Sequence, residues 1–219
     1  MTNSAGEPER TGPVGRPRDT ALDEAIILAT RRRLVKDGFS KMTIKDIVSD
    51  AKVGRSTLRR RWRNKFDLVV DALDYGFRKQ GDLYTVDLNA LEPRDALVEA
   101  VRHVDPARYS PDAMVLMGNF AAEAIRTPEL MEILREHAVR PRVGFIESAL
   151  TQLQGRRAVR AGIDVHTIST LCFGAYFANY YRGERYKDIP QDVVAVLWPT
   201  IAARTTMNRR STSPMRRGR

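Results

Sequence analysis

An all-α fold is the class that this 219-residue sequence predicts, and three observations predict it. Apolar residues recur three or four positions apart along most of the chain, which is the spacing of one helix face. Proline, glycine and short polar residues stand where these periodic runs begin and end. No segment alternates apolar and polar residues in the manner of a half-buried strand. We therefore expect an N-terminal three-helix domain, joined through a fourth helix to a larger C-terminal helical domain.

Start and stop signals divide the N-terminal part into short helices. The first helix is expected over residues 20–36 and ends at Gly38, because glycine readily adopts the left-handed conformation that closes a helix. Thr43 is the expected N-cap of the second helix, over residues 43–51, since its hydroxyl can accept a hydrogen bond from the first turn. Each helix carries one apolar face, so we expect the two to pack on each other.

Residues 52–62 have the pattern of a tight turn followed by a short third helix. Gly54 is expected to supply the backbone freedom that the turn of a helix-turn-helix requires. The third helix, over residues 56–62, buries only Leu58 and Trp62, which lie four positions apart. The side chains left on its outside are Thr57, Arg59, Arg60 and Arg61. A short helix with this much exposed positive charge is the layout of a recognition helix for the major groove of DNA.

The net charge of +10 is unevenly distributed along the chain. Residues 1–80 contain 18 Lys and Arg against 11 Asp and Glu, whereas residues 81–203 contain 13 against 16. The last 16 residues, 204–219, contain 6 basic residues and no acidic one. A basic N-terminal third attached to a mildly acidic body predicts a nucleic-acid-binding part joined to a part that binds something else.

These patterns divide the chain into four segments. We expect a disordered basic arm at 1–18, a helix-turn-helix DNA-binding domain at 19–64, a helical regulatory and dimerisation domain at 65–203, and a disordered basic tail at 204–219. The arginines of the arm either only solubilise the chain or follow the DNA backbone or minor groove. The basic tail would add nonspecific attraction to DNA.

The C-terminal helices are located by their start signals and apolar runs. They are expected at 64–81 from the cap Asn64, at 94–104, from Ser110-Pro111, from Thr127-Pro128 to 155 with a kink or break at Pro141, at 165–181 and at 190–201. The last two are apolar on more than one face, which favours packing on a partner as well as on their own chain. The alternative is a thick monomeric core.

Several classes of site find no support in the sequence. Cys172 is the single cysteine and lies in an apolar run, so we expect a small buried side chain in a reducing cytoplasm. The three histidines are isolated, and there is no phosphate-binding loop, membrane span or secretion signal. Single carboxylates on the expected helices read as rim charges or ion-pair partners: Glu123, Glu132, Glu136 and Glu147. We therefore expect no catalytic residue, no metal and no cofactor.

A set of residues in the N-terminal part carries a resemblance to a known family. It comprises Asp37-Gly38-Phe39, Thr43-Ile44, residues 51–58 (AKVGRSTL), Trp62, Lys65 and Leu68, preceded by Gly-Arg-Pro-Arg at 15–18. On these residues the stretch 20–73 resembles the DNA-binding domain of the TetR family of transcriptional regulators. One position departs from the family, because Arg59 stands where a tyrosine most often contacts the phosphate backbone. Arg59 either keeps that contact by its charge or reaches a base.

The exposed positions and the resemblance together give the candidate site residues. Base or near-base contacts are expected from Arg55, Ser56, Thr57 and Arg60, and phosphate contacts from Thr43, Arg63 and Lys65. A small-molecule pocket is expected between the C-terminal helices, since pockets in helical bundles are apolar with a few polar groups. Its candidate lining residues, each of which also reads as plain core, are Met114, Met117, Phe120, Phe145 and Tyr176.

The expected function is that of a TetR-like transcriptional repressor, which a small-molecule effector releases from a palindromic operator in double-stranded DNA. The resemblance implies a homodimer formed through the last two helices. Two alternatives stay open at this point. One is a constitutive or architectural DNA-binding protein without an effector, and the other is a small helical enzyme.

Overall fold

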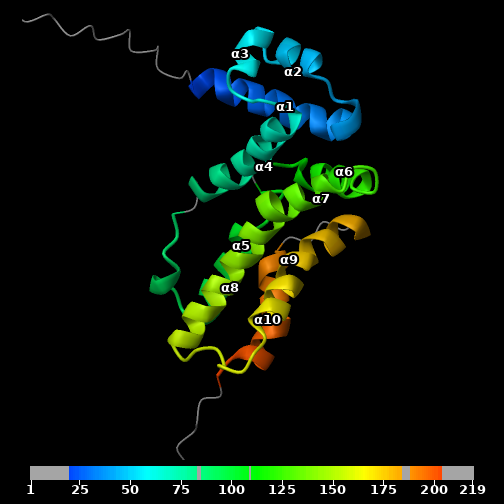
Figure 1. Cartoon of the computed structure of the whole chain (residues 1–219). Coiled ribbons are helices and arrows are strands. Elements are labelled where there is room, and N and C mark those ends of the chain that lie inside the picture. The colour runs from blue at the N-terminus through cyan, green and yellow to red at the C-terminus, as the bar shows by residue number, and fades with distance from the viewer. Residues whose placement is uncertain (1–19, 83–84, 109, 184–187, 204–219) are drawn as a thin grey trace, which may run out of the picture.

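The computed structural model describes residues 20–82, 85–108, 110–183 and 188–203, and the expected arm and tail lie outside these ranges (Figure 1). The described chain is helical, and its only pairing of extended segments is an isolated bridge between Val159 and Ala202. The all-α class is confirmed.

The N-terminal block consists of three helices with a fourth leading out of it (Figure 1). These are α1 (Thr20–Lys41), α2 (Ile44–Asp50), α3 (Arg55–Arg59) and α4 (Lys65–Asp82). Gly38 interrupts α1 with φ 70 and ψ 175, so the predicted helix stop is present as a kink followed by one further turn. Thr43 caps α2, because its hydroxyl oxygen accepts a hydrogen bond from the Asp46 amide at 3.2 Å.

The turn between α2 and α3 differs from the sequence-based expectation. Lys52, with φ 54, takes the left-handed conformation, whereas Gly54 has φ −77 and ψ 148 and is the N-cap residue of α3. The role expected of Gly54 was therefore wrong. The turn closes because the Val53 amide donates to the Val48 carbonyl at 3.0 Å, and the left-handed residue lies two positions before Gly54.

Two buried side chains hold α3 on the body of the block. Leu58 is 2% exposed and Trp62 is 6% exposed, as the sequence predicts. The Trp62 indole N–H also donates to Asp71 Oδ2 at 2.7 Å, which links the end of the recognition segment to α4. Asn64 caps α4 by accepting from the Asp67 amide at 2.9 Å.

The C-terminal part begins with a 3₁₀ turn, η1 (Leu88–Ala90), and continues through helices around a shared core. These are α5 (Pro93–His103), α6 (Ala113–Glu123), α7 (Glu129–Leu134), the π turn η2 (Arg135–Val139), α8 (Arg140–Gly155), α9 (Val165–Arg182) and α10 (Ile189–Ile201). Two expected caps were wrong. Asp112 and Pro128 occupy the N-cap positions of α6 and α7, and the Ser110 hydroxyl instead accepts a hydrogen bond from Arg31 Nη2 at 3.1 Å.

The break expected at Pro141 takes the form of the π turn η2, which lies between α7 and α8. Proline has no amide hydrogen, so the preceding turn cannot close with the regular helical hydrogen bond. Arg142 Nη1 donates to the Ala138 carbonyl of this turn at 2.7 Å. His137 of the π turn lies with Nδ1 2.7 Å from Asp74 Oδ1, so this irregular turn is fixed against α4.

The buried apolar residues form one cluster that runs from Ile26 of α1 to Ile201 of α10. Helix α4 belongs to both parts, since it packs on α1 and also on the π turn. The division into segments 19–64 and 65–203 therefore stays a prediction about function, because the packing is continuous across it.

Candidate nucleic-acid interface

Helix α3 presents a compact basic surface. Arg55, Ser56, Arg59 and Arg60 are exposed, and Thr57 is half-buried. Leu58 points into the core, so the exposed positions occupy the face of α3 that lies away from α1. Arg60 Nη2 lies 3.4 Å from Thr57 Oγ1, which brings these two candidate side chains together on the surface. Guanidinium groups displayed in this way can donate two parallel hydrogen bonds to guanine or to phosphate.

Arg61, which the sequence placed on the outside of α3, is directed inward. It forms an ion pair with Asp23 of α1, and its Nη1 donates to the Thr57 carbonyl at 3.2 Å. The expectation was wrong because α3 ends at Arg59, so residue 61 follows the turn beyond the helix and faces α1. This arginine fixes the orientation of the recognition helix.

A second arginine fixes α2. Arg33 of α1 forms two hydrogen bonds with the Asp50 carboxylate, at 2.6 and 2.8 Å, and one with Asp37 at 3.1 Å. The guanidinium beside it lowers the pKa of Asp50 below its ordinary value, so the pair stays ionised at neutral pH. Helices α2 and α3 are each anchored to α1 by one ion pair.

The candidate phosphate contacts are found in different surroundings. Arg63 is exposed, whereas the Thr43 hydroxyl donates to Asp46 Oδ2 at 2.6 Å within its own cap. Lys65 Nζ donates to the carbonyls of Phe39, at 2.6 Å, and Met42, at 3.1 Å, and lies 4.1 Å above the Phe39 ring. Burial lowers the pKa of Lys65. Lys65 therefore has a structural task at the corner between α1 and α2 in addition to the phosphate contact that the sequence predicts.

Side chains of α6 form hydrogen bonds with the main chain of α1 near its end, a contact that the sequence did not reveal. Asn119 Nδ2 donates to the carbonyls of Leu34, at 2.9 Å, and Val35, at 3.0 Å. Glu123 Oε2 accepts from the amide and the hydroxyl of Ser40, both at 2.7 Å. We call Asn119 and Glu123 the α6 latch. It joins the C-terminal part to the helix that carries α2 and α3.

The residues expected to line a pocket are largely buried in the core. Met114, Met117, Phe120 and Tyr176 are each at most 4% exposed, and the Tyr176 hydroxyl donates to the Val101 carbonyl at 2.7 Å. Phe145 is half-buried, with its ring 4.4 Å from that of His103. Their role in binding stays a prediction. A cavity of about 560 Å³ lies nearby, between α1, α4 and the start of α6, and none of these five residues lines it.

Helices α9 and α10 lie together on one flank of the molecule (Figure 1), and both expose apolar side chains. On α9 the exposed stripe consists of Leu171, Gly174, Ala178 and Tyr181, at helical spacing, whereas Cys172, Phe173 and Tyr176 face inward. On α10 Val196 is 75% exposed. Cys172 is fully buried, and burial raises its pKa to about 12, so it is the small buried side chain that the sequence predicts.

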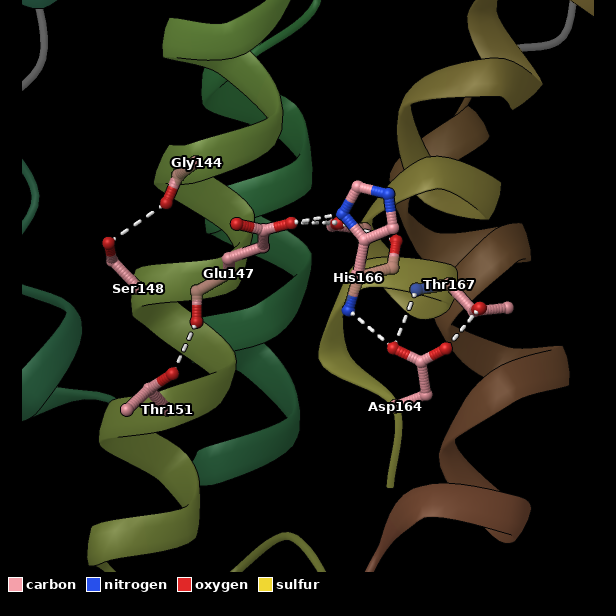
Figure 2. Close-up of polar contacts among 8 residues, drawn as sticks. Gly144, Glu147, Ser148, Thr151, Asp164, His166 and Thr167 are labelled. Atoms are coloured by element: carbon pink, nitrogen blue, oxygen red, sulfur yellow. Dashed lines mark hydrogen bonds and ion pairs between the residues drawn. The ribbon is translucent and has the colours of Figure 1, made fainter. Parts of the chain in front are cut away.

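Polar contacts set the position of this flank. Figure 2 shows Glu147 of α8 reaching His166 at the first turn of α9, with Glu147 Oε1 2.9 Å from His166 Nδ1. Asp164 caps α9 by accepting from the amides of His166 and Thr167, at 3.0 and 3.2 Å. The start of α9 is thus fixed against α8, and the stripe along α9 stays exposed.

The described ranges also bear on membrane-spanning helices and on metal sites. No helix there is long and apolar enough to cross a membrane. Across the same residues, no three His, Cys, Asp or Glu side chains are grouped so that they could hold a metal ion.

Sequence comparison places the N-terminal block among known regulators. A family model described as bacterial regulatory proteins, tetR family, matches residues 26–72. YdeS, an uncharacterised helix-turn-helix regulator of Bacillus subtilis strain 168, is 36% identical over 58 residues, which are 26% of this chain and only 29% of that protein. Rv1556, an uncharacterised regulator of the same type from Mycobacterium tuberculosis H37Rv, is 28% identical over 159 residues, 71% of this chain and 72% of its own.

Solved structures share the fold of the whole described chain. A protein from Mesorhizobium loti MAFF303099, assigned to the TetR family, matches with a TM-score of 0.68 at 15% identity and covers 86% of this chain and 100% of its own. The flavonoid-responsive regulator FrrA gives 0.66 at 16% identity, covering 85% and 100%. A regulator from Saccharomonospora viridis in complex with choline gives 0.61 at 18% identity, again covering 85% and 100%.

The sequence relatives and the shared fold are those of DNA-binding regulators rather than of enzymes. The matched family model covers the helices that carry the basic surface of α3, and the structural match extends through α10. Residues 26–72 therefore match the TetR family of bacterial regulatory proteins. Over 71% of its length the chain is similar in sequence to a helix-turn-helix transcriptional regulator, and most of it shares the fold of a solved protein assigned to the TetR family.

Proposed function

We propose that the chain is a homodimeric repressor, which binds a roughly palindromic operator in double-stranded DNA and leaves it when a small-molecule effector binds the C-terminal part. The observation that carries the proposal is the combination of a five-residue recognition helix with exposed arginines and an uncovered apolar stripe on α9 and α10. One short helix contacts only a few base pairs, so a second copy is needed for a specific site.

The division of labour on DNA follows from exposure. Arg55, Ser56, Thr57 and Arg60 would contact bases or their neighbours in the major groove, and Arg59 would contact either a base or phosphate. Thr43, Arg63 and Lys65 would contact phosphates and set the register. Lys65 has three donor hydrogens and uses two of them internally, which leaves one for a phosphate oxygen.

The dimer would form through the stripe on α9 and the exposed face of α10. An isologous interface between two copies would cover Leu171, Tyr181 and Val196, which are 52%, 73% and 75% exposed in the single chain. Gly174 and Ala178 lie between them and are small, so two α9 helices can approach closely there. The two recognition helices would then enter successive major grooves, about 34 to 36 Å apart.

The α6 latch is the route by which an effector would act on DNA binding. Asn119 and Glu123 hold α1, and α1 carries the ion pairs that position α2 and α3. A shift of α6 would therefore change the separation of the recognition helices in the dimer. For release, the effector must bind the shifted form more tightly than the form that fits DNA. Two structural relatives carry ligand names, choline and flavonoid, which supports an effector of some kind.

We propose the cytoplasm as the location of the protein, and its similarity to bacterial helix-turn-helix regulators supports this. A constitutive or architectural DNA-binding protein is the alternative that the basic surface of α3 also accommodates. The two differ in their DNA, because a repressor selects an inverted repeat, whereas an architectural protein binds with little sequence preference.

Selection of duplexes from a random pool by the purified protein tests the function. We expect an inverted repeat whose half-sites are separated by about one helical turn. Recovery of unrelated sequences with equal affinity would refute the repressor proposal. The dimer is tested by sedimentation of Val196→Glu, which should be monomeric. Ile125→Glu is the matched control, because Ile125 is an 89% exposed apolar residue outside α9 and α10.

A further inference from the structure

The cavity of about 560 Å³ lies where the N-terminal block meets the C-terminal part. Its walls come from α1, α4, the residues that precede α6, and α8. The apolar wall consists of Leu28, Pro106, Pro111 and Ala113 with the ring of Tyr75. Volumes of about 300 to 1,000 Å³ with mostly apolar walls are typical of sites for small organic molecules.

Two guanidinium groups line this cavity. Arg142 of α8 is 5% exposed, donates to the Ala138 carbonyl at 2.7 Å, and lies 5.0 Å from the Phe77 ring. Arg31 of α1 donates through Nη1 to the Ala72 carbonyl at 2.6 Å and through Nη2 to Ser110 Oγ at 3.1 Å. Within the described ranges, both of these hydrogen-bond partners of Arg31 are neutral, and no carboxylate lies within ion-pair distance of its guanidinium.

The two cations oppose each other electrostatically. Burial and, next, the charge on Arg31 lower the pKa of Arg142, and Asp105 acts against them, with a net result of about 10. Burial lowers the pKa of Arg31 as well. Burying two like charges beside each other is costly, and an anion between them would remove the repulsion and the need for solvation.

The two carboxylates that line the cavity, Glu24 and Asp82, are not placed to act as that anion, and Asp105, which acts on Arg142, is not part of the lining. Glu24 accepts a hydrogen bond from the Tyr75 hydroxyl and pairs with Lys79 Nζ at 3.5 Å. Asp82 lies at the exposed end of α4. An anionic ligand that enters the cavity would therefore find one lining carboxylate, Glu24, already paired with Lys79 and the other, Asp82, at the exposed end of α4.

From this arrangement we propose that the cavity is the effector site and that its ligand is a small amphiphilic organic acid. The carboxylate of the ligand lies between Arg31 and Arg142, and its apolar part packs against Leu28, Pro106 and Pro111. This inference rests on the proposed effector-controlled function. It also connects the ligand to the switch, because Arg31 belongs to α1 and Ser110 immediately precedes α6. Drawing Arg31 to a ligand would remove its hydrogen bond to Ser110, at the opposite end of α6 from the latch.

Gly76 offers a way to disturb the site without removing a charge. A Cβ at this position of α4 would lie 2.8 Å from Arg31 Nη1 and 3.1 Å from Nη2, so Gly76→Ala forces the guanidinium to move. Gly81→Ala is the matched control, since it makes the same change on the same helix and meets nothing within 4 Å. Arg31→Gln removes the charge and keeps a hydrogen-bonding side chain.

The binding experiment uses calorimetric titration with benzoate, 4-phenylbutyrate and decanoate, each compared with its neutral primary amide and with choline as a cationic probe. We expect at least one acid to bind about tenfold or more tightly than its amide, the difference that one charge-assisted hydrogen bond supplies. Arg31→Gln and Gly76→Ala should each weaken the acid about tenfold, whereas Gly81→Ala should not. Equal binding of acid and amide, unchanged binding in both site variants, or binding of choline alone would overturn the inference.

Operator binding is measured separately so that the two proposals fail in different ways. Sequence-specific DNA binding that no acid weakens would overturn the acid-effector inference and leave the regulator proposal standing. Charge-dependent acid binding without sequence-specific DNA binding would support the site and refute the repressor. Acid binding that raises the Kd for the operator about tenfold or more, and fails to do so in Gly76→Ala, is the outcome expected if both proposals hold.

Discussion

Replacing Gly38 by alanine should destabilise the protein at the kink of α1. Gly38 has φ 70 and ψ 175, a backbone conformation that is essentially restricted to glycine. The substitution also meets the α6 latch, because a Cβ at this position would lie 2.1 Å from Glu123 Oε1. The Glu123 carboxylate would have to move and would lose its hydrogen bonds to Ser40.

The magnitude follows from three contributions. The strained backbone costs about 1 to 3 kcal/mol. Loss of the two exposed hydrogen bonds from Ser40 to Glu123, each 2.7 Å long, costs about 1 kcal/mol in total, because solvent replaces part of them. The lower conformational entropy of unfolded alanine offsets about 0.4 to 1 kcal/mol. We therefore expect the free energy of unfolding to fall by about 2 kcal/mol.

Urea denaturation followed by far-ultraviolet circular dichroism measures this change. Gly144→Ala is the control, because Gly144 lies inside α8 with nothing within 4 Å of the added Cβ and should be stabilised by about 0.5 to 1 kcal/mol. In a Glu123→Ala background the steric part should disappear and the backbone part should remain. A Gly38→Ala protein as stable as the wild type would refute the reasoning.

Three further predictions concern a buried histidine, the DNA surface and an indole hydrogen bond. Burial, and then the charges of nearby arginines, lower the pKa of His103 to about 4, so the unfolded chain takes up a proton before the folded one does as the pH falls. The free energy of unfolding should therefore fall by up to about 3 kcal/mol between about pH 6.5 and pH 4. Urea denaturation of the wild type and His103→Asn at each pH checks this difference. In gel-shift titrations Arg60→Ala should relax the base preference at one operator position, with unchanged stability of the protein. Lys65→Met should lower the free energy of unfolding by about 1 to 3 kcal/mol. If Lys65 also contacts a phosphate, this variant should reduce the slope of log affinity for DNA against log salt concentration by about 0.9. Trp62→Phe removes the N–H that donates to Asp71 and should cost about 1 kcal/mol, measured by thermal unfolding, and no change would mean that this hydrogen bond does not fix the recognition segment.

Local signals in the sequence predicted the helices well where the interaction that ends or starts a helix is itself local. Thr43 and Asn64 each accept a hydrogen bond from the amide three residues ahead, so the cap is contained in the neighbouring sequence. The stop at Gly38 belongs to the same class. The burial of Leu58 and Trp62 followed from their spacing alone.

The expectations that were wrong involve partners far away in the chain. Ser110 has the local pattern of a helix cap, but Arg31, 79 positions earlier, uses its hydroxyl. Arg61 looked exposed because a longer α3 was assumed, and its partner Asp23 is 38 positions away. Glu123, which the sequence suggested to be a rim charge or an ion-pair partner, accepts hydrogen bonds from Ser40, which lies 83 positions earlier. No periodic pattern contains such pairs, since they are fixed only when the helices pack.

The α6 latch recognises the backbone of α1 more than its side chains. Asn119 contacts two carbonyl oxygens, and Glu123 contacts an amide together with the Ser40 hydroxyl. Every residue except proline offers the same main-chain groups, so side chains along the end of α1 can be replaced without loss of most of these bonds. The connection between α6 and α1 therefore depends mainly on the glycine kink and the path of the backbone, and most side-chain replacements at the end of α1 should leave these bonds in place.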